Sequence, residues 1–561
     1  MAIKKKVALF FIPLILYMSL LSFMPLMEPD EARYSSISSF MNSSGDYVTP
    51  RLDHVVYLEK PPLCYWATAL LFRIFGENEF SSRLFVALCA WGCVILVFKM
   101  GKYFQDERTG LYSAAIFSTF LFPFVMGRIN ILDMPLTFFV CLATWSGYRY
   151  VSSGYREKGW IYLLYVASAL AFLAKGLIGV VFPFTIIVLW LLSYRRYGEV
   201  LKLFPPVGIA LFLLLSCPWL ILVQRANPDF FHFFFIQEHF LRYTTTMHHR
   251  NEPFWYFIPI VILGTLPWAA FLYKAMREKS PNMTRSLKTT DRRFLLVWIF
   301  FILGFFSLSS SKLVPYIAPV FLPIAVLFGG LFSVYDTRDI QTEKAGYNKF
   351  LCHLPIILQS LLFIVLLVVP PFIKKPRIEG GLIIMHPEKW WLLVAPLILL
   401  QMLIIFLPDV VKRRWHRGWF ATIYILTAFF LALSVFPVSE FLTPYKSAYP
   451  VACAINTLLP QHQKLYQYKI SLYGVDFYNK IRTPLVDDIG ELSFGSGKLP
   501  REEKKQYFLS SEEFYKLCCE KGEIYCIIQY KDRLEELKKH ISHIDILWSN
   551  GIYYFLRLTA S

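Results

Sequence analysis

Long apolar runs separated by short polar stretches fill the first 437 residues of the chain. A helix needs about 20 mostly apolar residues to cross the hydrocarbon core of a bilayer, so this pattern predicts repeated membrane crossings. The stretch 61–76 is a weaker candidate. Thirteen stronger candidates lie at 7–27, 83–100, 111–127, 133–150, 160–175, 177–194, 204–223, 254–275, 294–309, 315–335, 350–371, 391–408 and 419–437.

The composition agrees with this pattern. Of the 561 residues, 56% are hydrophobic and 17% are charged, whereas soluble domains are charged at about a quarter of their positions. This excludes soluble globular, disordered, collagen-like and disulfide-scaffold proteins. The 10 cysteines lie mostly in apolar runs, without CxxC or zinc-site spacing, so we expect them to contribute packing.

The basic residues predict the orientation, because short cytoplasmic loops concentrate lysine and arginine. With the amino terminus inside, the segments expected in the cytoplasm are each rich in basic residues. They are Lys4 to Lys6, Lys99 to Arg108, Arg149 to Lys158, Arg195 to Lys202, Lys274 to Arg293, Asp336 to Lys349 and Lys412 to Arg417. Orientation therefore explains most of the net charge of +18, and nucleic-acid binding is a poor inference from it.

The composition changes at about residue 438, where the apolar runs stop and the charges nearly balance. We therefore divide the chain into a membrane domain, 1–437, and a small α/β domain, 438–561. A capping box at Ser510 and Glu513 predicts a helix that ends at Gly522. An odd number of crossings places this domain outside the cytoplasm. The elements expected after Gly522 are a strand, a helix and a hairpin, at Glu523–Tyr530, Lys531–His540, and His543–Trp548 with Ile552–Leu558.

The most informative polar cluster follows the first crossing. Asp30, Arg33 and Tyr34 have the spacing i, i+3 and i+4, so they share one helical face at the membrane surface. A carboxylate at a helix start is adequately explained by the helix dipole, which also accounts for Glu31. The dipole does not require the arginine and the tyrosine, so the triad is a candidate site.

A second cluster in the same loop is Glu59-Lys60, directly before Pro61-Pro62. The prolines favour extended backbone, so the two charged side chains are expected to diverge and to find other partners. Interfacial anchoring explains Lys60 as well as phosphate binding does. Glu59 is harder to explain, because an ionisable group at membrane depth is costly unless it is paired.

Further polar clusters lie in other loops expected on the outer side. Taken singly, each is adequately explained as a loop or a helix-end anchor. Taken together they are predicted on one face of the membrane, which chance placement does not explain. These clusters are Arg128 to Pro135 with Asp133, Lys175-Gly176, Gln237 to Tyr243, His248 to Trp255, and Ser309 to Tyr316 with Lys312.

Several carboxylates and cations at a lipid–water boundary suit the transfer of a sugar from a polyprenyl phosphate. Charge develops on the leaving phosphate while the sugar becomes oxocarbenium-like, so cations and carboxylates both stabilise the transition state. The chain has no GxxxxGK[ST] nucleotide loop. A site outside the cytoplasm also favours a lipid-linked donor over a nucleotide sugar.

The order of these motifs resembles that of the bacterial lipid A 4-amino-4-deoxy-L-arabinose transferases, which are GT-C glycosyltransferases related to protein O-mannosyltransferases. The likeness spans the membrane part and weakens in the terminal domain. It implies thirteen crossings, a periplasmic site at the inner membrane, an undecaprenyl-phosphate-linked sugar donor and inversion at the anomeric carbon. The motifs are Asp30 to Tyr34, Gly45-Asp46, Glu59 to Pro62, Arg128 to Pro135, Ala174 to Gly176, Glu238-His239 with Arg242, and Ser311-Lys312 with Tyr316.

The resemblance implies a role for individual residues. Asp30 and Asp133 would be the catalytic carboxylates. Glu59 and His239 would hold one divalent metal ion such as zinc, although His248 and His249 compete for that role; no nucleotide cofactor is expected. The residues implied around the donor phosphate or the substrate are Arg33, Tyr34, Tyr57, Lys60, Arg128, Lys175, Arg242, Lys312 and Tyr316.

The implied function is transfer of the aminosugar to a lipid A phosphate by a monomer, giving resistance to polymyxin and other cationic peptides. An ionised phosphate acceptor needs no base, so Asp30 would orient or balance charge; a hydroxyl acceptor would require it as the base. A second interpretation keeps the fold but transfers a hexose or hexosamine to lipid A, protein or glycan. A third is a lipid or solute transporter, but the internal duplication common in transporters is not evident.

Overall fold

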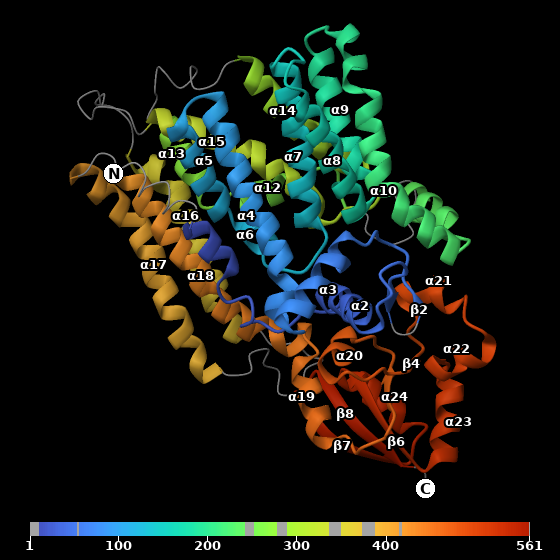
Figure 1. Ribbon diagram of the computed structural model, residues 1–561. Coiled ribbons are helices and arrows are strands. Elements are labelled where there is room, and N and C mark those ends of the chain that lie inside the picture. Colours follow the sequence, from blue (N-terminus) through green and yellow to red (C-terminus); the bar gives the residue numbers. More distant parts are fainter. Residues whose placement is uncertain are drawn as a thin grey trace.

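The computed structural model describes residues 11–52, 55–241, 252–277, 289–335, 349–372, 387–414 and 418–559. Figure 1 shows a large helical bundle with a smaller region of strands and helices, coloured orange to red, against one end of it. The helices α2 (Asp30–Ser44) and α3 (Leu63–Phe75) lie between the two parts. The molecule therefore has a junction built from the segment that follows the first apolar run.

Each of the thirteen apolar runs contains helix within the described residues. Residues 11–18 are helical. The other helices of the bundle are α4 (Glu79–Phe104), α5 (Glu107–Thr119), α6 (Leu121–Met126), α7 (Asp133–Ser152), α8 (Lys158–Lys175), α9 (Ile178–Leu192), α10 (Pro206–Ala226), α12 (Phe257–Gly264), α13 (Trp268–Arg277), α14 (Thr289–Leu308), α15 (Phe321–Tyr335), α16 (Lys349–Val368), α17 (Pro387–Arg414) and α18 (Trp419–Lys446). Shorter elements are the strands β1 (Arg51–Leu52) and β2 (Val55–Val56), the 3-10 helices η1 (Tyr197–Leu203), η4 (Val314–Val320) and η6 (Pro370–Phe372), and the π-helix η2 (His232–Leu241).

Two runs that the pattern predicts as single helices are broken. Phe120 has extended backbone and separates α5 from α6. In the run 254–275, α12 ends at Gly264 and α13 begins at Trp268, directly after Pro267, which cannot donate a backbone hydrogen bond. Apolarity along the chain does not distinguish one crossing helix from two shorter ones packed end to end.

The bundle has the surface of a multi-pass membrane protein. Within the described residues, five segments are long and apolar enough to cross a bilayer by length and composition. These segments are Glu79–Phe104, Pro206–Ala226, Val314–Ser333, Lys389–Pro408 and Trp419–Lys446. Large apolar side chains on α10 and α17 face outward, with Leu214 69% and Leu392 76% exposed.

The interior of the bundle is closely packed around α4, α5, α7, α8 and α9. Trp145, Trp268 and Trp298 are almost completely buried. Gly110 lets α5 approach α4, because a Cβ atom there would lie 2.6 Å from the backbone oxygen of Phe98. Any larger residue at this position would force the two helices apart.

The carboxyl-terminal part contains, within the described residues, a six-stranded mixed sheet in the order β5-β4-β3-β6-β8-β7. The strands β3, β4, β5 and β6 pair in parallel, and β8 pairs antiparallel with β6 and β7. Its elements are α19 (Tyr449–Leu458), β3 (Leu465–Tyr468), α20 (Tyr473–Asn479), β4 (Leu485–Val486), η7 (Gly490–Leu492), α21 (Ser493–Ser496), α22 (Arg501–Tyr507), β5 (Phe508–Leu509), α23 (Ser511–Lys521), β6 (Glu523–Gln529), α24 (Lys531–Lys538), β7 (His543–Ser549) and β8 (Tyr553–Thr559).

The local elements expected after residue 510 are confirmed. Ser510 caps α23, since its hydroxyl accepts from the Glu513 N–H at 3.2 Å and the Glu513 carboxylate accepts from the Ser510 N–H at 2.9 Å. Gly522 ends the helix with φ of 72°. The expected strand is β6, the expected helix is α24, and the hairpin is β7 and β8.

The two parts of the chain meet without a flexible connection. Helix α18 continues through Pro437 to Lys446, so it extends beyond the boundary expected at residue 437. The backbone N–H of Leu26 donates to the Tyr478 hydroxyl at 2.8 Å, and the Gly474 N–H donates to Glu28 Oε1 at 2.6 Å. Helix α20 is thereby fixed to the segment that leads into α2.

Candidate active site

A cavity of about 620 Å³ is lined by residues of the bundle and by Glu491 of the carboxyl-terminal part. Its apolar lining residues include Val181, Phe182, Ile236, Phe305 and Phe306. Because charged and phenolic residues line it as well, the cavity suits an amphiphilic ligand. The charged and phenolic residues that line it are Asp30, Arg33, Tyr34, Tyr57, Glu59, Lys60, Asp133, Lys175, Glu238, Tyr316 and Glu491.

The first turn of α2 provides the predicted triad. Arg33 Nη2 donates to Asp30 Oδ1 at 2.5 Å, which confirms that the i, i+3 pair shares a helical face. The Arg33 side chain is buried, whereas that of Asp30 is 55% exposed. On its other side, Arg33 forms an ion pair with Glu491, a residue of the carboxyl-terminal part.

Tyrosine rings surround the Arg33 guanidinium. Its Cζ atom lies 5.6 Å from the ring centre of Tyr34, 5.9 Å from that of Tyr57 and 5.6 Å from that of Tyr473. Such contacts stabilise a cation that has been removed from water. Burial, followed by the Glu59 carboxylate, raises the pKa of Tyr57, so its hydroxyl stays protonated and donates to Glu59 Oε2 at 3.1 Å.

The divergence that the prolines predict for Lys60 and Glu59 is incomplete, because the two side chains still form a long ion pair. Lys60 Nζ lies 3.1 Å from Glu238 Oε2 of η2 and donates to the backbone oxygen of Glu59 at 3.0 Å. The Glu59 carboxylate is farther from it, at 3.8 Å. The main charged partner of Lys60 therefore comes from a distant segment.

Asp133 and Lys175 form the other acid–base pair of the cavity. Asp133 begins α7, Lys175 ends α8, and the two side chains are 2.5 Å apart. Lys175 Nζ also lies 5.0 Å from the ring centre of Tyr316, which follows α14 in η4. Three segments that sequence analysis singled out separately are thus brought together.

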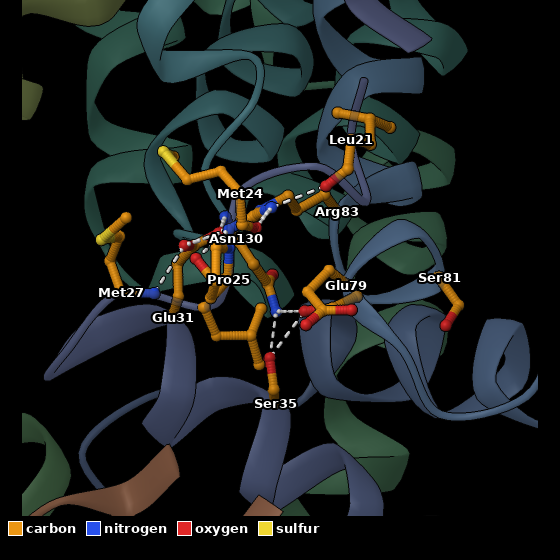
Figure 2. Close-up of polar contacts among 12 residues, drawn as sticks. Leu21, Met24, Pro25, Met27, Glu31, Ser35, Glu79, Ser81, Arg83 and Asn130 are labelled. Atoms are coloured by element: carbon orange, nitrogen blue, oxygen red, sulfur yellow. Dashed lines mark hydrogen bonds and ion pairs between the residues drawn. The ribbon is translucent and has the colours of Figure 1, made fainter. Parts of the chain in front are cut away.

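A buried ion pair joins Glu31, the residue next to Asp30, to Arg83, and Figure 2 shows the polar contacts around it. Arg83 of α4 donates from Nε to Glu31 Oε1 at 2.7 Å and from Nη2 to Glu31 Oε2 at 2.8 Å. Both side chains are 1% exposed. The remaining Arg83 donors reach the backbone oxygens of Leu21, Met24 and Pro25 at 2.5–3.0 Å.

The same carboxylate reaches the loop before α7. Glu31 Oε1 accepts from the backbone N–H of Asn130 at 2.8 Å, and the Asn130 side chain donates to Ser35 at 3.2 Å and Ser82 at 3.0 Å. Glu31 adjoins Asp30, and Asn130 precedes Asp133 by three residues. The network therefore fixes the two candidate catalytic segments relative to each other (Figure 2).

Some residues implied by the family resemblance lie elsewhere. Arg128 donates to the backbone oxygens of Leu16 at 2.7 Å and Ser19 at 2.6 Å, and it does not line the cavity. Lys312 is buried and donates to the backbone oxygen of Ser309 at 2.7 Å, likewise outside the lining. Both side chains therefore bind backbone oxygens instead of lining the cavity.

The other implied residues are outside the described part. They are Arg242, His248 and His249, together with the side chain of His239. In the part of the chain that the structure describes, no group of three or more His, Cys, Asp or Glu side chains could hold a metal ion. Metal binding by Glu59 and His239 accordingly stays a prediction.

The chain has recognisable relatives. The profile of the dolichyl-phosphate-mannose-protein mannosyltransferase family matches residues 59–222. The undecaprenyl phosphate-α-4-amino-4-deoxy-L-arabinose arabinosyl transferase of Erwinia tasmaniensis is 33% identical over 319 residues, 55% of this chain and 56% of the relative. That of Aeromonas hydrophila is 35% identical over 308 residues, 54% of this chain and 55% of the relative. The chain thus spans little more than half the length of these curated relatives in the matched regions.

Solved structures extend the likeness to the whole fold. The crystal structure of ArnT from Cupriavidus metallidurans in the apo state superposes with a TM-score of 0.81 at 24% identity, covering 99% of this chain and 98% of that one. The same protein bound to undecaprenyl phosphate gives a TM-score of 0.83 with the same identity and coverage. The chain is thus similar in sequence to the aminoarabinose transferases and shares the fold of ArnT. The resemblance predicted from the motifs is thereby confirmed.

The structure gives three acidic residues in or beside the site partners that the sequence did not predict. Glu238 lies within one of the motifs on which the resemblance rests, but only the fold shows that it pairs with Lys60. Glu31 was explained by the helix dipole, whereas it is the centre of a buried network. Glu491 carried no signal, because it is one acid among many in a charge-balanced domain.

Proposed function

We propose that the protein transfers 4-amino-4-deoxy-L-arabinose from undecaprenyl phosphate to a lipid A phosphate, at the periplasmic face of the bacterial inner membrane. The observation that carries this proposal is that one cavity is lined by Asp30 and Asp133 together with three cations and several apolar side chains. The names of the curated relatives and the undecaprenyl phosphate in the superposed ArnT structure support the donor.

The chemistry follows from this arrangement. An ionised lipid A phosphate oxygen attacks the anomeric carbon from the face opposite the leaving group, forming a new carbon–oxygen bond with inversion. The bond to undecaprenyl phosphate breaks, and its electron pair stays on the departing phosphate oxygen. Lys60, Lys175 and Arg33 stabilise this charge, while Asp30 and Asp133 stabilise the oxocarbenium-like sugar. Asp30 acts as a base only with a hydroxyl acceptor.

The charge of the cavity supports an amino sugar over a neutral hexose. Among the described lining residues there are five carboxylates against three cations. Arg33, Lys60 and Lys175 each have an acidic partner. A donor whose sugar carries an ammonium offsets the added charge of its phosphate, whereas a neutral hexose does not.

The proposal includes finer features of the family. These are thirteen crossings, a periplasmic carboxyl-terminal domain, a monomeric enzyme and resistance to polymyxin. A reporter fused after Ser561 should be active only outside the cytoplasm, and cytoplasmic activity would overturn this topology. One divalent ion at Glu59 and His239 is a further prediction, which metal analysis of the purified wild type and of Glu59→Gln tests.

The decisive experiment is mass spectrometry of lipid A and of polyprenyl-linked precursors from cells with the gene, without it, and with the Asp30→Asn variant. Wild-type cells should show aminoarabinose on lipid A phosphate. Modification of protein or glycan instead would support the hexosyl alternative. Precursors that change membrane side without any transferred sugar would support a transporter. Wild-type modification by Asp30→Asn would contradict the site.

A further inference from the structure

The carboxyl-terminal domain contributes a residue to the cavity. Among the described lining residues, Glu491 of η7 is the one that follows Lys446 in sequence. Its side chain is 34% exposed, pairs with Arg33 and accepts from the Tyr57 hydroxyl at 3.4 Å. The domain thus contacts both the guanidinium of Arg33 and the phenol of Tyr57 in the candidate active site.

The segment that carries Glu491 is firmly docked against the bundle. Phe494 stacks on Phe233 of η2 with ring centres 3.9 Å apart. A Cβ atom on Gly495 would lie 2.4 Å from the backbone oxygen of Val56, so this backbone passes directly beside the strand that precedes Tyr57. Leu492 is buried in the cluster that contains Tyr57. Docking therefore fixes where the Glu491 carboxylate lies.

Arg33 is consequently held between two carboxylates. Asp30 contacts it from within α2, and Glu491 contacts it from the other domain. The ring of Tyr473 adds a third contact from the carboxyl-terminal side. If Glu491 lost its charge, the buried guanidinium would be balanced by Asp30 alone and would bind that carboxylate more tightly.

We infer that Glu491 is a positioning residue: it shares the charge of Arg33, so that the guanidinium binds the Asp30 carboxylate less tightly and leaves it exposed to the cavity. The carboxyl-terminal domain thereby completes the active site of the transferase. This inference deepens the proposed function and rests on it for the role of Asp30.

The first test compares Glu491→Gln with Glu502→Gln, a matched change at an exposed glutamate of α22 in the same domain. Purified in detergent, both should keep the thermal unfolding temperature of the wild type. Glu491→Gln should lower kcat about tenfold without raising the KM for the donor, a fraction of the hundredfold or more that loss of a catalytic carboxylate costs. A raised KM with unchanged kcat, or no change at all, would overturn the inference.

The route through Arg33 is tested by a double-mutant cycle. If Glu491 acts on Asp30 through Arg33, then Glu491→Gln should have little further effect on kcat in an Arg33→Met background. Additive losses would show that Glu491 acts independently of Arg33 and would contradict the inference.

A binding measurement separates this inference from the proposed reaction. With Glu491 neutralised, Arg33 is less compensated, so Glu491→Gln should bind undecaprenyl phosphate about threefold more tightly than the wild type and Glu502→Gln do. Unchanged or weaker binding would overturn the inference even if the wild type transferred no aminosugar. Absence of transfer by the wild type, with tighter binding by Glu491→Gln, would instead reject the proposed function alone.

Discussion

Two neighbouring acidic residues at the start of α2 lie in opposite environments. Glu31 points into the protein and pairs with Arg83, and both side chains are 1% exposed. Asp30 faces the cavity, is 55% exposed and pairs with Arg33, whose Nε atom is buried without a hydrogen-bond partner. The Arg83 guanidinium, by contrast, donates from all three of its nitrogens. The Arg83–Glu31 pair, in which every guanidinium nitrogen donates, stabilises the fold. The Arg33–Asp30 pair, in which one nitrogen has no acceptor, remains available to a ligand.

Breaking the buried pair should have the largest effect. Arg83→Met leaves the Glu31 carboxylate buried without its cation, which typically costs about 3–5 kcal/mol of folding free energy. We expect the variant to lose most of its folded yield, measured by size-exclusion chromatography and thermal unfolding in detergent. Arg73→Met, at an exposed position of α3, is the control and should behave as the wild type. A stable Arg83→Met protein would show that the network is dispensable.

Removing the exposed acid should give the opposite pattern. Asp30→Asn keeps the shape of the side chain and Glu491 still pairs with Arg33, so the unfolding free energy should change by less than about 1 kcal/mol. Transfer should fall about a hundredfold or more, because the carboxylate can no longer stabilise the reacting sugar. Initial rates with purified donor and acceptor measure this loss. Equal losses of stability and activity would erase the difference between Asp30 and Glu31.

A cation of the cavity should have an intermediate effect. Lys60→Ala removes a charge from the proposed phosphate site and breaks the ion pair with Glu238. We expect the KM for the donor to rise about tenfold, with a smaller fall in kcat. Conservative changes in the segment Lys274 to Arg293 should alter neither constant. The same loss is predicted for Arg242→Ala, although Arg242 lies outside the described residues.

A surface ion pair should have the smallest effect. A hydrogen bond from Lys469 Nζ, at 2.6 Å, lowers the pKa of Glu536 to about 2. The stability that this ion pair contributes is therefore present above the pKa of Glu536 in the unfolded chain, near 4.5. It is lost as the pH falls from there towards 2. Because the pair is partly exposed, we expect a difference below about 1 kcal/mol between the wild type and Glu536→Gln, seen in thermal unfolding across that pH range. An equal pH dependence in both proteins would assign the effect to other groups.

The sequence predicted the structural features that depend only on residues close together in the chain. The capping box at Ser510, the end of α23 at Gly522 and the common face of Asp30 and Arg33 all follow from spacing within one turn. The pairs made by Arg83 and Lys60 join residues 52 and 178 positions apart. Such pairs depend on how helices pack, so a single sequence does not specify them.

The same limit explains the helix breaks and the boundary between the domains. Phe120 interrupts an apolar run because of its backbone geometry, which hydrophobicity does not encode. Conversely, α18 passes through Pro437, where sequence rules favour an end. Glu491 is the strongest case, since its role arises only from docking of one domain on the other.

Hydrogen bonds fix the segment before α2 to the residues from Lys446 onward, and they limit how this protein can be recombined with its relatives. The N–H groups of Leu26 and Glu28 donate to Tyr478 and to the backbone oxygen of Lys446, and Glu28 accepts in turn from Gly474. A chimera that exchanges only the region after Lys446 would have to preserve these acceptors and donors. Without them, the turn that presents Asp30 would lose its anchor, so the two halves are not interchangeable modules.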